Sequence, residues 1–290
     1  MRHYLPLIAS FATFVVVSCA GCAAAAAATQ VNTGQAAHSP SSTVSASPTA
    51  KAAKQAGQRL SAAVASVIKS DDGHAAVAVD DLTTGQTASY NGGGDFVTAS
   101  IVKVDILSTL LYQSQQSGES LSDEQRELAT TMIENSDNDA ASDLYDDDGA
   151  ATGIDAANKA FGLTDTAAGT DGYWGLTTTT VTDQIKVLRQ VFTSDSLLTS
   201  SSRDYIQNLM SQVEADQRWG VSAAASSGSY LVKNGWLPNP DLWEINSIGE
   251  VTHDGQKLLI VVLSADNETE DGGIALVQQI AQATADAITS

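Results

Sequence analysis

Three short motifs follow one another along the chain, and their residue types could carry out acyl transfer through a serine ester. A serine hydroxyl becomes a nucleophile when a neighbouring base takes its proton, and a buried lysine near another cation can serve as that base. On one helix face Ser100 and Lys103 would meet in this way, beside free backbone N–H groups that can stabilise an oxyanion. The motifs are Ser100-Ile101-Val102-Lys103, Ser136-Asp137-Asn138 and Lys233-Asn234-Gly235.

The three motifs differ in how specific they are. Ser-x-x-Lys alone is weak, because Ser66-Val67-Ile68-Lys69 also matches, late in a predicted helix and without a strand-to-helix turn before it. Ser-Asp-Asn is more specific, although Ser136 and Asp137 also suit a helix N-cap. The three motifs in this order, each in a fitting structural context, indicate an acyl-transfer site.

The elements that must position these motifs form an early and a late group of strands with helices between them. Apolar residues at helical spacing predict helices over 52–69, 100–115, 122–135, 137–145, 154–161, 181–192, 201–213 and 276–288. Extended patterns predict strands over 74–82, up to Tyr90, and over 229–236, 242–252 and 257–264. We therefore expect an α+β fold of the broad α/β class. An antiparallel five-stranded sheet would be flanked by the terminal helices, an all-helical lobe would lie beside it, and the site would lie in the cleft between the lobes.

With its motifs in these contexts, the chain resembles the penicillin-recognising serine enzymes, and most closely the class A β-lactamases, which carry the same three motifs. The resemblance covers roughly residues 55 to 290 and implies a β-lactamase/transpeptidase-like fold. Residues 216–220, 233–238 and 245–249 are also similar to a bacterial branch known simply as serine hydrolases.

The resemblance implies a role for each residue of the first two motifs and for the lysine of the third. Ser100 would be the nucleophile, Lys103 its activator, and Ser136 the donor of a proton to the leaving nitrogen. Asn138 would bind the side-chain amide of the substrate. Lys233 would set the local electric field and attract the substrate's carboxylate.

The region of the third motif would complete the substrate site. By the same resemblance, the backbone N–H groups of Ser100 and Trp236 would form the oxyanion hole, and Gly235 would line the site from a strand edge. Asn234 stands where the family has threonine or serine, so its amide is expected to donate to the substrate's carboxylate in place of a hydroxyl. Arg218 is a further candidate for binding that carboxylate, and a plain surface salt bridge is its alternative role.

One part of the family's pattern is missing. Class A enzymes carry a tryptophan-glutamate pair whose glutamate activates the deacylating water, but here Gly175 follows Trp174. No glutamate occurs between Glu134 and Glu214, and Asp171 is the nearest carboxylate in sequence. Loss of one general base typically costs on the order of 10²–10⁴ in rate. We therefore expect the acyl-enzyme to form and its release to be slow.

The composition excludes several other functions. The chain has 34 acidic and 14 basic residues and a formal net charge of -20, which argues against nucleic acid or anionic lipid headgroups as partners. The 4 histidines stand at positions 3, 38, 74 and 253, a distribution that favours neither a Ser-His-Asp triad nor a zinc site. We expect no metal, no cofactor and a monomeric protein.

The N-terminal residues 1–22 are predicted to be a lipoprotein signal peptide. Arg2 and His3 precede an apolar stretch too short to span a bilayer, and small residues then lead to two cysteines. Cys19 fits a lipidation site, and Cys22 is the other candidate. The alternative is cleavage in the following alanine run, which would give a secreted protein.

The remaining chain divides into a tether and a domain. Residues 23–50 are rich in Ala, Ser and Thr, have no apolar period, and are predicted to be a disordered tether. Residues 51–290 form the predicted serine hydrolase domain. It would be exported and held by a lipid anchor at the outer face of the cell membrane. Because Cys19 and Cys22 are the chain's 2 cysteines, this domain has no disulfide.

These observations predict a serine hydrolase that forms an acyl-enzyme with β-lactams or D-alanyl peptides. One alternative is a D,D-peptidase-like enzyme that barely turns over β-lactams. The other is a catalytically silent, wall-associated binding lipoprotein that keeps the site only for ligand binding. The retained serines and lysines argue against the silent protein, whereas the missing glutamate argues for it.

Overall fold

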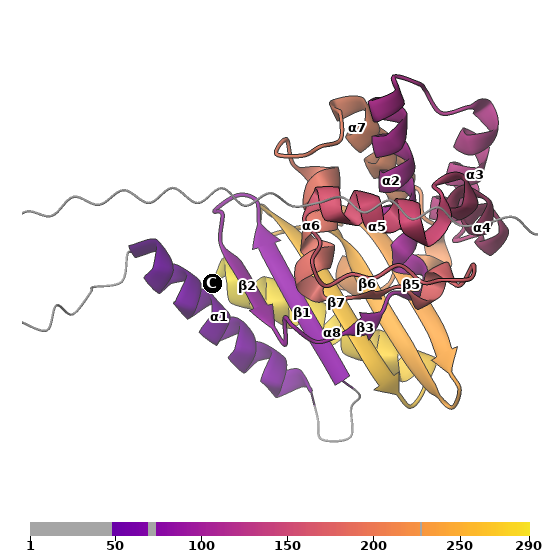
Figure 1. Cartoon of the computed structure of the whole chain (residues 1–290). Helices are drawn as coiled ribbons and strands as arrows, with labels where there is room; N and C mark the ends of the chain where they lie inside the picture. The colour runs from indigo at the N-terminus through magenta and orange to yellow at the C-terminus, as the bar shows by residue number, and fades with distance from the viewer. Residues whose placement is uncertain (1–47, 69–73, 227) are drawn as a thin grey trace, which may run out of the picture. The chain divides into compact units, whose positions relative to one another are not determined.

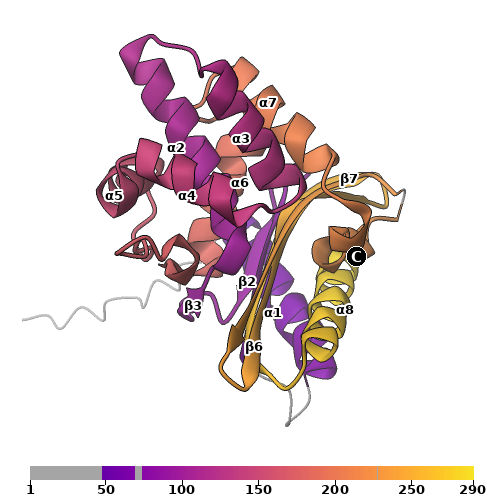
Figure 2. The same ribbon diagram turned by 90° about the vertical axis from the view of Figure 1, so that its right-hand side faces the viewer.

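A five-stranded antiparallel sheet runs through the middle of the domain, and helices cover both of its faces (Figure 1, Figure 2). The computed structural model describes residues 48–68, 74–226 and 228–290. The spatial order of the strands is β2-β1-β7-β6-β5. Their bounds are β1 (His74–Asp81), β2 (Thr87–Tyr90), β5 (Tyr230–Asn239), β6 (Leu242–His253) and β7 (Gln256–Asn267). The predicted five-stranded antiparallel sheet is confirmed.

Both faces of this sheet are apolar, because side chains alternate between the two faces along a strand. In β1, Val77 belongs to the core on one face and Ala78 to the core on the other. In β7, Ile260 and Val261 divide in the same way. Strands β1 and β7 therefore contain nearly continuous apolar runs in the sequence.

Two terminal helices, α1 (Pro48–Val67) and α8 (Glu270–Thr289), cover one face of the sheet, as Figure 2 shows. Leu60 of α1 and Ile280 of α8 are buried in the core on this side. The predicted flanking helices are thus confirmed. Within the described part of the chain, no helix combines the length and the apolarity needed to cross a membrane.

The start of α1 differs slightly from the prediction. Residues 48–50, expected to end the tether, form its first turn. Proline has no backbone N–H group. It is tolerated there because the N–H groups of the first turn have no carbonyl partner within the helix. The predicted signal peptide and residues 23–47 of the tether lie outside the described residues, as do Cys19 and Cys22.

The other face of the sheet carries a layer of helices that supplies two of the three motifs (Figure 2). Its central helix is buried from Val102 to Leu111. Ser122 and Gln125 form a capping box at the start of the next helix, which explains why its beginning was predictable. The helices of this layer are α2 (Val102–Ser117), α3 (Asp123–Glu134), α4 (Asn138–Asp147), α5 (Ala150–Phe161), α6 (Val181–Phe192) and α7 (Ser200–Ser211).

The sequence prediction missed several short elements. Strands β3 (Phe96–Val97) and β4 (Thr178–Thr179) pair antiparallel in a second, two-stranded sheet. Two residues are too few to show an alternating pattern, so such strands carry no periodic signal. The described residues also form four 3-10 helices: η1 (Ala99–Ile101), η2 (Trp174–Leu176), η3 (Ala215–Gln217) and η4 (Gly220–Ala224). The helix predicted from residue 100 thus begins as η1 and continues as α2.

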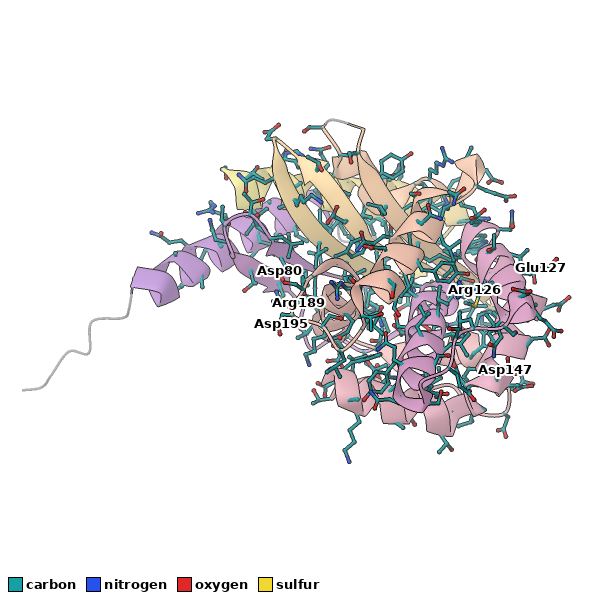
Figure 3. All side chains as sticks on the ribbon, turned by 90° about the horizontal axis from the view of Figure 1, so that it is seen from above. Asp80, Arg126, Glu127, Asp147, Arg189 and Asp195 are labelled. Atoms are coloured by element: carbon teal, nitrogen blue, oxygen red, sulfur yellow. The ribbon has the colours of Figure 1, made fainter. Side chains whose placement is uncertain are left out.

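An ion pair ties the helical layer to the sheet. Asp80 of β1 bonds to Arg189 of α6, and both are labelled in Figure 3. The Asp80 side chain is almost fully buried, so it needs a cationic partner to offset the loss of hydration. This contact joins α6 of the helical layer to β1 of the sheet.

Candidate active site

Ser100 lies in the middle of η1, at the point where β3 gives way to α2. The residue before it, Ala99, has a φ of 47°, in the left-handed region that non-glycine residues seldom occupy. The Thr98 nitrogen donates to the Thr177 oxygen at 2.8 Å, beside the pairing of β3 with β4. Ser100 itself is half-buried. A strained and firmly held turn therefore presents its hydroxyl.

Gly235 of the third motif lies directly against this turn. A Cβ at position 235 would lie 2.6 Å from the Ser100 nitrogen and 2.8 Å from the Thr98 oxygen. Carbon atoms do not approach backbone atoms so closely, so only glycine allows β5 to lie here. The expectation that Gly235 lies at the site agrees with this geometry.

Asn246 of β6 holds the same turn from the sheet, a role that the sequence analysis did not assign. Its Nδ2 donates to the Val97 oxygen at 2.8 Å and the Thr98 oxygen at 3.0 Å. Its Oδ1 accepts from the Ser264 nitrogen at 3.2 Å, and the side chain is fully buried. The available signal was a lone amide in the middle of a predicted strand.

Lys103 joins the first motif to the second. Its Nζ donates to the Ser136 oxygen at 2.6 Å, the Ser136 Oγ at 3.1 Å and the Asn138 Oδ1 at 2.8 Å. It also lies 4.9 Å from the centre of the Trp174 ring. Burial lowers the pKa of Lys103 from 10.5 to about 7, although the negative charge of Asp137 opposes the shift. This amine therefore changes its charge near neutral pH.

Lys233 brings the third motif to the same hydroxyl. Its Nζ donates to the Ser136 Oγ at 2.9 Å and to the Asn234 oxygen at 3.2 Å. Burial lowers the pKa of Lys233 well below its ordinary value, and the positive charge of Lys103 lowers it further. Ser136, whose φ is 57°, thus lies between two buried amines. Protons can pass between the lysines through this hydroxyl.

The expected contact between nucleophile and base is not formed in this structure. Both residues are described, yet no hydrogen bond joins the Ser100 Oγ to the Lys103 Nζ. Three donated bonds are the pattern of a protonated ammonium. Deprotonated Lys103 would have one hydrogen fewer and a free lone pair, with which it could accept the proton of Ser100.

Asn234 does not lie where the sequence analysis expected its amide. The residue is fully buried, and its Nδ2 donates to the Gln217 oxygen at 2.7 Å and the Trp219 oxygen at 3.0 Å. Because side chains alternate along β5, Lys233 and Gly235 face Ser136 and Ser100 while Asn234 faces the opposite way. A contact within the protein therefore replaces the expected contact with the substrate.

Arg218 and Trp236 lie near this contact. The exposed Arg218 donates from Nε to the Val213 oxygen at 2.7 Å. It forms no ion pair with an acidic residue in the described part of the chain, so the alternative of a salt bridge is not observed. Trp236 packs edge-on against Trp219, with ring centres 5.9 Å apart. Substrate contacts of Arg218 and of the Trp236 backbone remain predictions.

The segment around η2 contains the position of the missing glutamate. Trp174 donates from Nε1 to the Ser142 Oγ at 3.1 Å, which fixes the ring beside Lys103. A Cβ at Gly175 would meet no atom within 4 Å. Asp171 is exposed and accepts a hydrogen bond from Thr170 at 3.4 Å, without a bond to any motif residue. Position 175 therefore has room for a Cβ.

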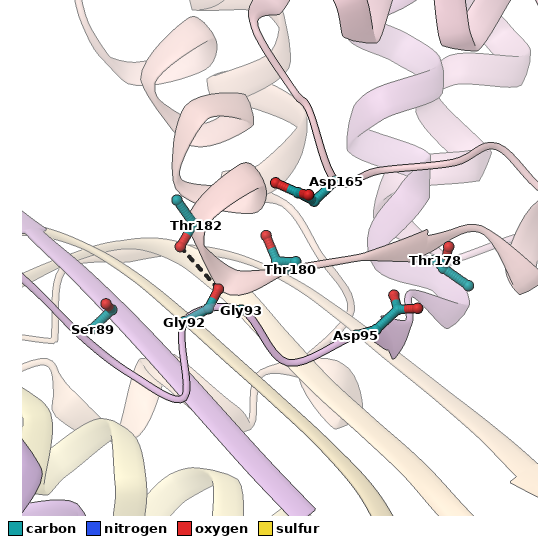
Figure 4. Close-up of a pocket in the computed structure, with 8 residues that line it drawn as sticks. All are labelled: Ser89, Gly92, Gly93, Asp95, Asp165, Thr178, Thr180 and Thr182. Carbon is teal, nitrogen blue, oxygen red and sulfur yellow. Dashed lines mark hydrogen bonds between the residues drawn. The ribbon is translucent and has the colours of Figure 1, made fainter.

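A separate cavity of about 620 Å³ lies beside β4 and the start of α6 (Figure 4). Thr182 donates to the Gly92 oxygen at 3.0 Å across one side of it. No residue of the three motifs lines it, so we place the chemistry at the motifs. Its lining residues are Ser89, Gly92, Gly93, Asp95, Asp165, Thr178, Thr180 and Thr182.

Among the described residues, no group of three or more His, Cys, Asp or Glu side chains could hold a metal ion.

Sequence comparison adds a family and a set of distant relatives. The profile of the Beta-lactamase enzyme family matches residues 59–126 and 122–288. A protein of Mycobacterium tuberculosis named "Putative lipoprotein LppW" is 27% identical over 167 residues, which are 56% of this chain and 53% of that protein. The chain thus spans about half the length of the curated relatives it matches, and a Mycobacterium bovis protein of the same name matches equally.

Structural comparison shows the fold. A class A β-lactamase from Bacteroides cellulosilyticus is 18% identical, with a TM-score of 0.71 over 81% of this chain and 99% of that one. The TLA-1 extended-spectrum β-lactamase is 15% identical, with a TM-score of 0.73 over 81% of this chain and 100% of that one. A mutant of PBP-A, solved as an acyl-enzyme complex with penicillin G, is 18% identical, with a TM-score of 0.68 over 81% and 97%.

Proposed function

The chain belongs to the β-lactamase enzyme family, and we propose that it is a serine hydrolase whose Ser100 forms an acyl-enzyme with β-lactams or D-alanyl peptides. One observation carries the proposal: two buried lysine amines share the hydroxyl of Ser136 beside the turn that presents Ser100. Burying two amines side by side costs folding free energy, and such perturbed groups are concentrated at functional sites.

Acylation follows from this arrangement in balanced steps. Neutral Lys103 takes the proton of Ser100, and the Ser100 Oγ attacks the carbonyl carbon of the substrate. The oxyanion is held by the backbone N–H groups of Ser100 and Trp236. When the carbon–nitrogen bond breaks, Ser136 gives its proton to the leaving nitrogen and receives the proton that Lys103 had taken.

Two further residues would bind the substrate. Asn138 presents its amide at the edge of the site and would bind the side-chain amide of the substrate. Lys233 in its protonated form would supply positive charge for a carboxylate, whose negative charge favours that form. Arg218 is a second candidate because no ion pair within the described residues occupies its guanidinium. The captured acyl-enzyme of PBP-A supports this substrate class, since that protein shares the fold.

Release of the acyl group is proposed to be slow. Gly175 provides no base for the water that must attack the ester. Gly175 favours a penicillin-binding or D,D-peptidase-like enzyme, the second candidate function, over an efficient β-lactamase.

Mass spectrometry of the intact protein after treatment with penicillin G tests acylation. We expect the wild type to gain the mass of one penicillin, and Ser100→Ala to gain none. Ser66→Ala is the matched control, because Ser66 belongs to the other Ser-x-x-Lys sequence and lies exposed on α1. A wild type without adduct, or an adduct retained by Ser100→Ala, would contradict the proposal.

The time course of release separates the two kinds of hydrolase. After removal of free penicillin, a slow acyl-enzyme keeps its added mass for minutes to hours, and nitrocefin hydrolysis is negligible. Rapid loss of the adduct with steady nitrocefin turnover would instead indicate a working β-lactamase.

Lipid attachment at Cys19, with Cys22 as the alternative, is proposed for the full chain and would place the domain at the outer face of the membrane. The name of the mycobacterial relative supports this proposal. Labelling with a fatty-acid analogue in a bacterial host should mark the wild type and fail for one of Cys19→Ala and Cys22→Ala. Equal labelling of both variants, or no labelling of the wild type, would contradict it.

A further inference from the structure

A segment outside the three motifs connects the second motif to the third. We call residues 214–220 the brace segment. At its first residue, the Glu214 nitrogen donates to the Glu134 oxygen at 3.0 Å, and Asn135 Nδ2 donates to the Glu214 Oε1 at 2.5 Å. The brace segment is thus bonded to the residues that lead directly into Ser136.

Gln217 bonds both to Asn135, next to the second motif, and to Asn234 of the third motif. Its side-chain Nε2 donates to the Asn135 oxygen at 3.1 Å, and its backbone oxygen accepts from Asn234 Nδ2 at 2.7 Å. Asn135 precedes Ser136 in the chain, and Asn234 follows Lys233. Gln217 is 9% exposed, so water competes little for these bonds.

The sheet side of the brace segment is held at further points. Asn234 also donates to the Trp219 oxygen at 3.0 Å, and the Trp219 ring packs against Trp236. A Cβ at Gly220, whose φ is 79°, would lie 2.1 Å from the Ser247 Oγ. These contacts leave the brace segment little freedom to shift relative to β5.

The position of Ser136 relative to Lys233 depends on how the two layers are held together. Ser136 belongs to the connection between α3 and α4, whereas Lys233 belongs to the sheet. The Lys233 Nζ nevertheless donates to the Ser136 Oγ at 2.9 Å. A small shift of the connection would open this bond, and a misplacement of about 1 Å can cost on the order of 10² in rate.

We propose that Gln217 and Asn234 are positioning residues that hold the Ser136 hydroxyl between the amines of Lys103 and Lys233. The proposal deepens the proposed acyl-enzyme function and rests on it for its catalytic meaning. It also explains the departure in the third motif: Asn234 acts through the brace segment and not through the substrate. Neither residue touches the reacting atoms.

The test measures the titration of both lysines by NMR in protein labelled with ¹³C at lysine Cε, with assignments from Lys103→Arg and Lys233→Arg. Gln217→Met keeps the length of the side chain and removes the donor. Gln207→Met is the matched control, because Gln207 Nε2 also donates to one backbone oxygen, that of Val191 at 2.7 Å, away from the motifs.

We expect Gln217→Met to raise the titration midpoint of Lys103 from about 7 toward the ordinary lysine value, because a loosened site admits water. Gln207→Met should leave the titration midpoint of Lys103 unchanged, even if this variant lowers the melting temperature as much as Gln217→Met does. Gln217→Ala provides the same comparison should the methionine variant not fold. Unchanged lysine titration in the Gln217 variants, or an equal change in the control, would overturn the proposal.

Acylation by penicillin G provides a second readout. The Gln217→Met variant should be acylated about 10-fold or more slowly at saturating penicillin, with little change in the concentration giving half-maximal rate. Slower acylation with normal lysine titration would also overturn the positioning role. A wild type that shows perturbed lysines but never forms an adduct would contradict the proposed function instead and leave the positioning role standing.

Discussion

Gly235 and Ser100 are in contact so close that a single methyl group could not be placed between them. A Cβ on residue 235 would lie 2.6 Å from the Ser100 nitrogen, and the same atom is the proposed oxyanion donor. The strand edge therefore leaves no room for a side chain between β5 and the nucleophile turn.

Gly235→Ala should lower the rate of acylation by about 10²-fold, because the added methyl group must push the Ser100 turn away from β5. The rate is measured by mass spectrometry at a fixed time after mixing with penicillin G. Gly93→Ala is the control, since a Cβ there meets no atom within 4 Å. Equal acylation of Gly235→Ala and wild type would contradict the role of this contact.

The acylation rate should rise with pH through about 7 and then level off. Lys103 must be neutral to take the proton of Ser100, and its pKa is lowered to about 7. Below this value the neutral fraction falls about ten-fold for each pH unit. Acylation rates measured between pH 5 and 9 test this expectation. A profile that is flat between pH 5 and pH 9 would contradict a Lys103 base that titrates near neutral pH.

Gly175→Glu should speed release of the acyl group. A Cβ at this position meets no atom within 4 Å, so a side chain can begin there without displacing a neighbour. A positioned general base contributes about 10²–10⁴-fold, and we expect at least a ten-fold faster loss of the penicillin adduct. Gly175→Gln is the control, because glutamine has the size of glutamate but no carboxylate. A glutamate variant no faster than the glutamine variant would show that the carboxylate does not reach the ester.

Asp105→Asn should stabilise the protein above neutral pH. Burial raises the pKa of Asp105 from 3.8 to about 7, and the charge of Asp183 adds to the shift while the bond from Gln184 opposes it. The folded state thus holds this proton more tightly than the unfolded state. The contribution of Asp105 to the free energy of unfolding is therefore largest below pH 4 and declines as the pH rises to about 7, by at most about 4 kcal/mol.

Urea unfolding at pH 4 and pH 8 measures this effect. We expect Asp105→Asn to raise the free energy of unfolding at pH 8 by about 1–3 kcal/mol and to change it little at pH 4. Asp143→Asn, at an exposed position on α4, should leave the pH dependence as it is in the wild type. A destabilised Asp105→Asn at pH 8 would show that the carboxylate is needed in its charged form.

The helix boundaries illustrate what local sequence specifies. Helix α6 begins at Val181 and ends at Phe192, as predicted, because an apolar face and the Thr180 N-cap are both encoded within a few residues. Strands β3 and β4 were missed. Each has two residues, and they pair only because tertiary folding brings positions 96–97 to positions 178–179.

In the candidate site, too, some features follow from the sequence and others depend on tertiary contacts. The family and the sheet could be predicted from the sequence alone. Ser100, Lys103, Ser136 and Lys233 could be proposed as site residues, because acyl transfer requires those residue types. The direction of the Asn234 amide was decided only in the tertiary structure, where strand alternation turns it toward Gln217.

Long-range partners explain why Asn246 and Gln217 escaped sequence reasoning. Asn246 bonds to Val97, 149 positions away in the chain, and Gln217 bonds to Asn135, 82 positions away. No local pattern encodes which distant carbonyl oxygen a buried amide will meet. Residue types alone therefore determined which chemistry is available, whereas packing of the helical layer against the sheet decided which groups hold the reacting atoms in place.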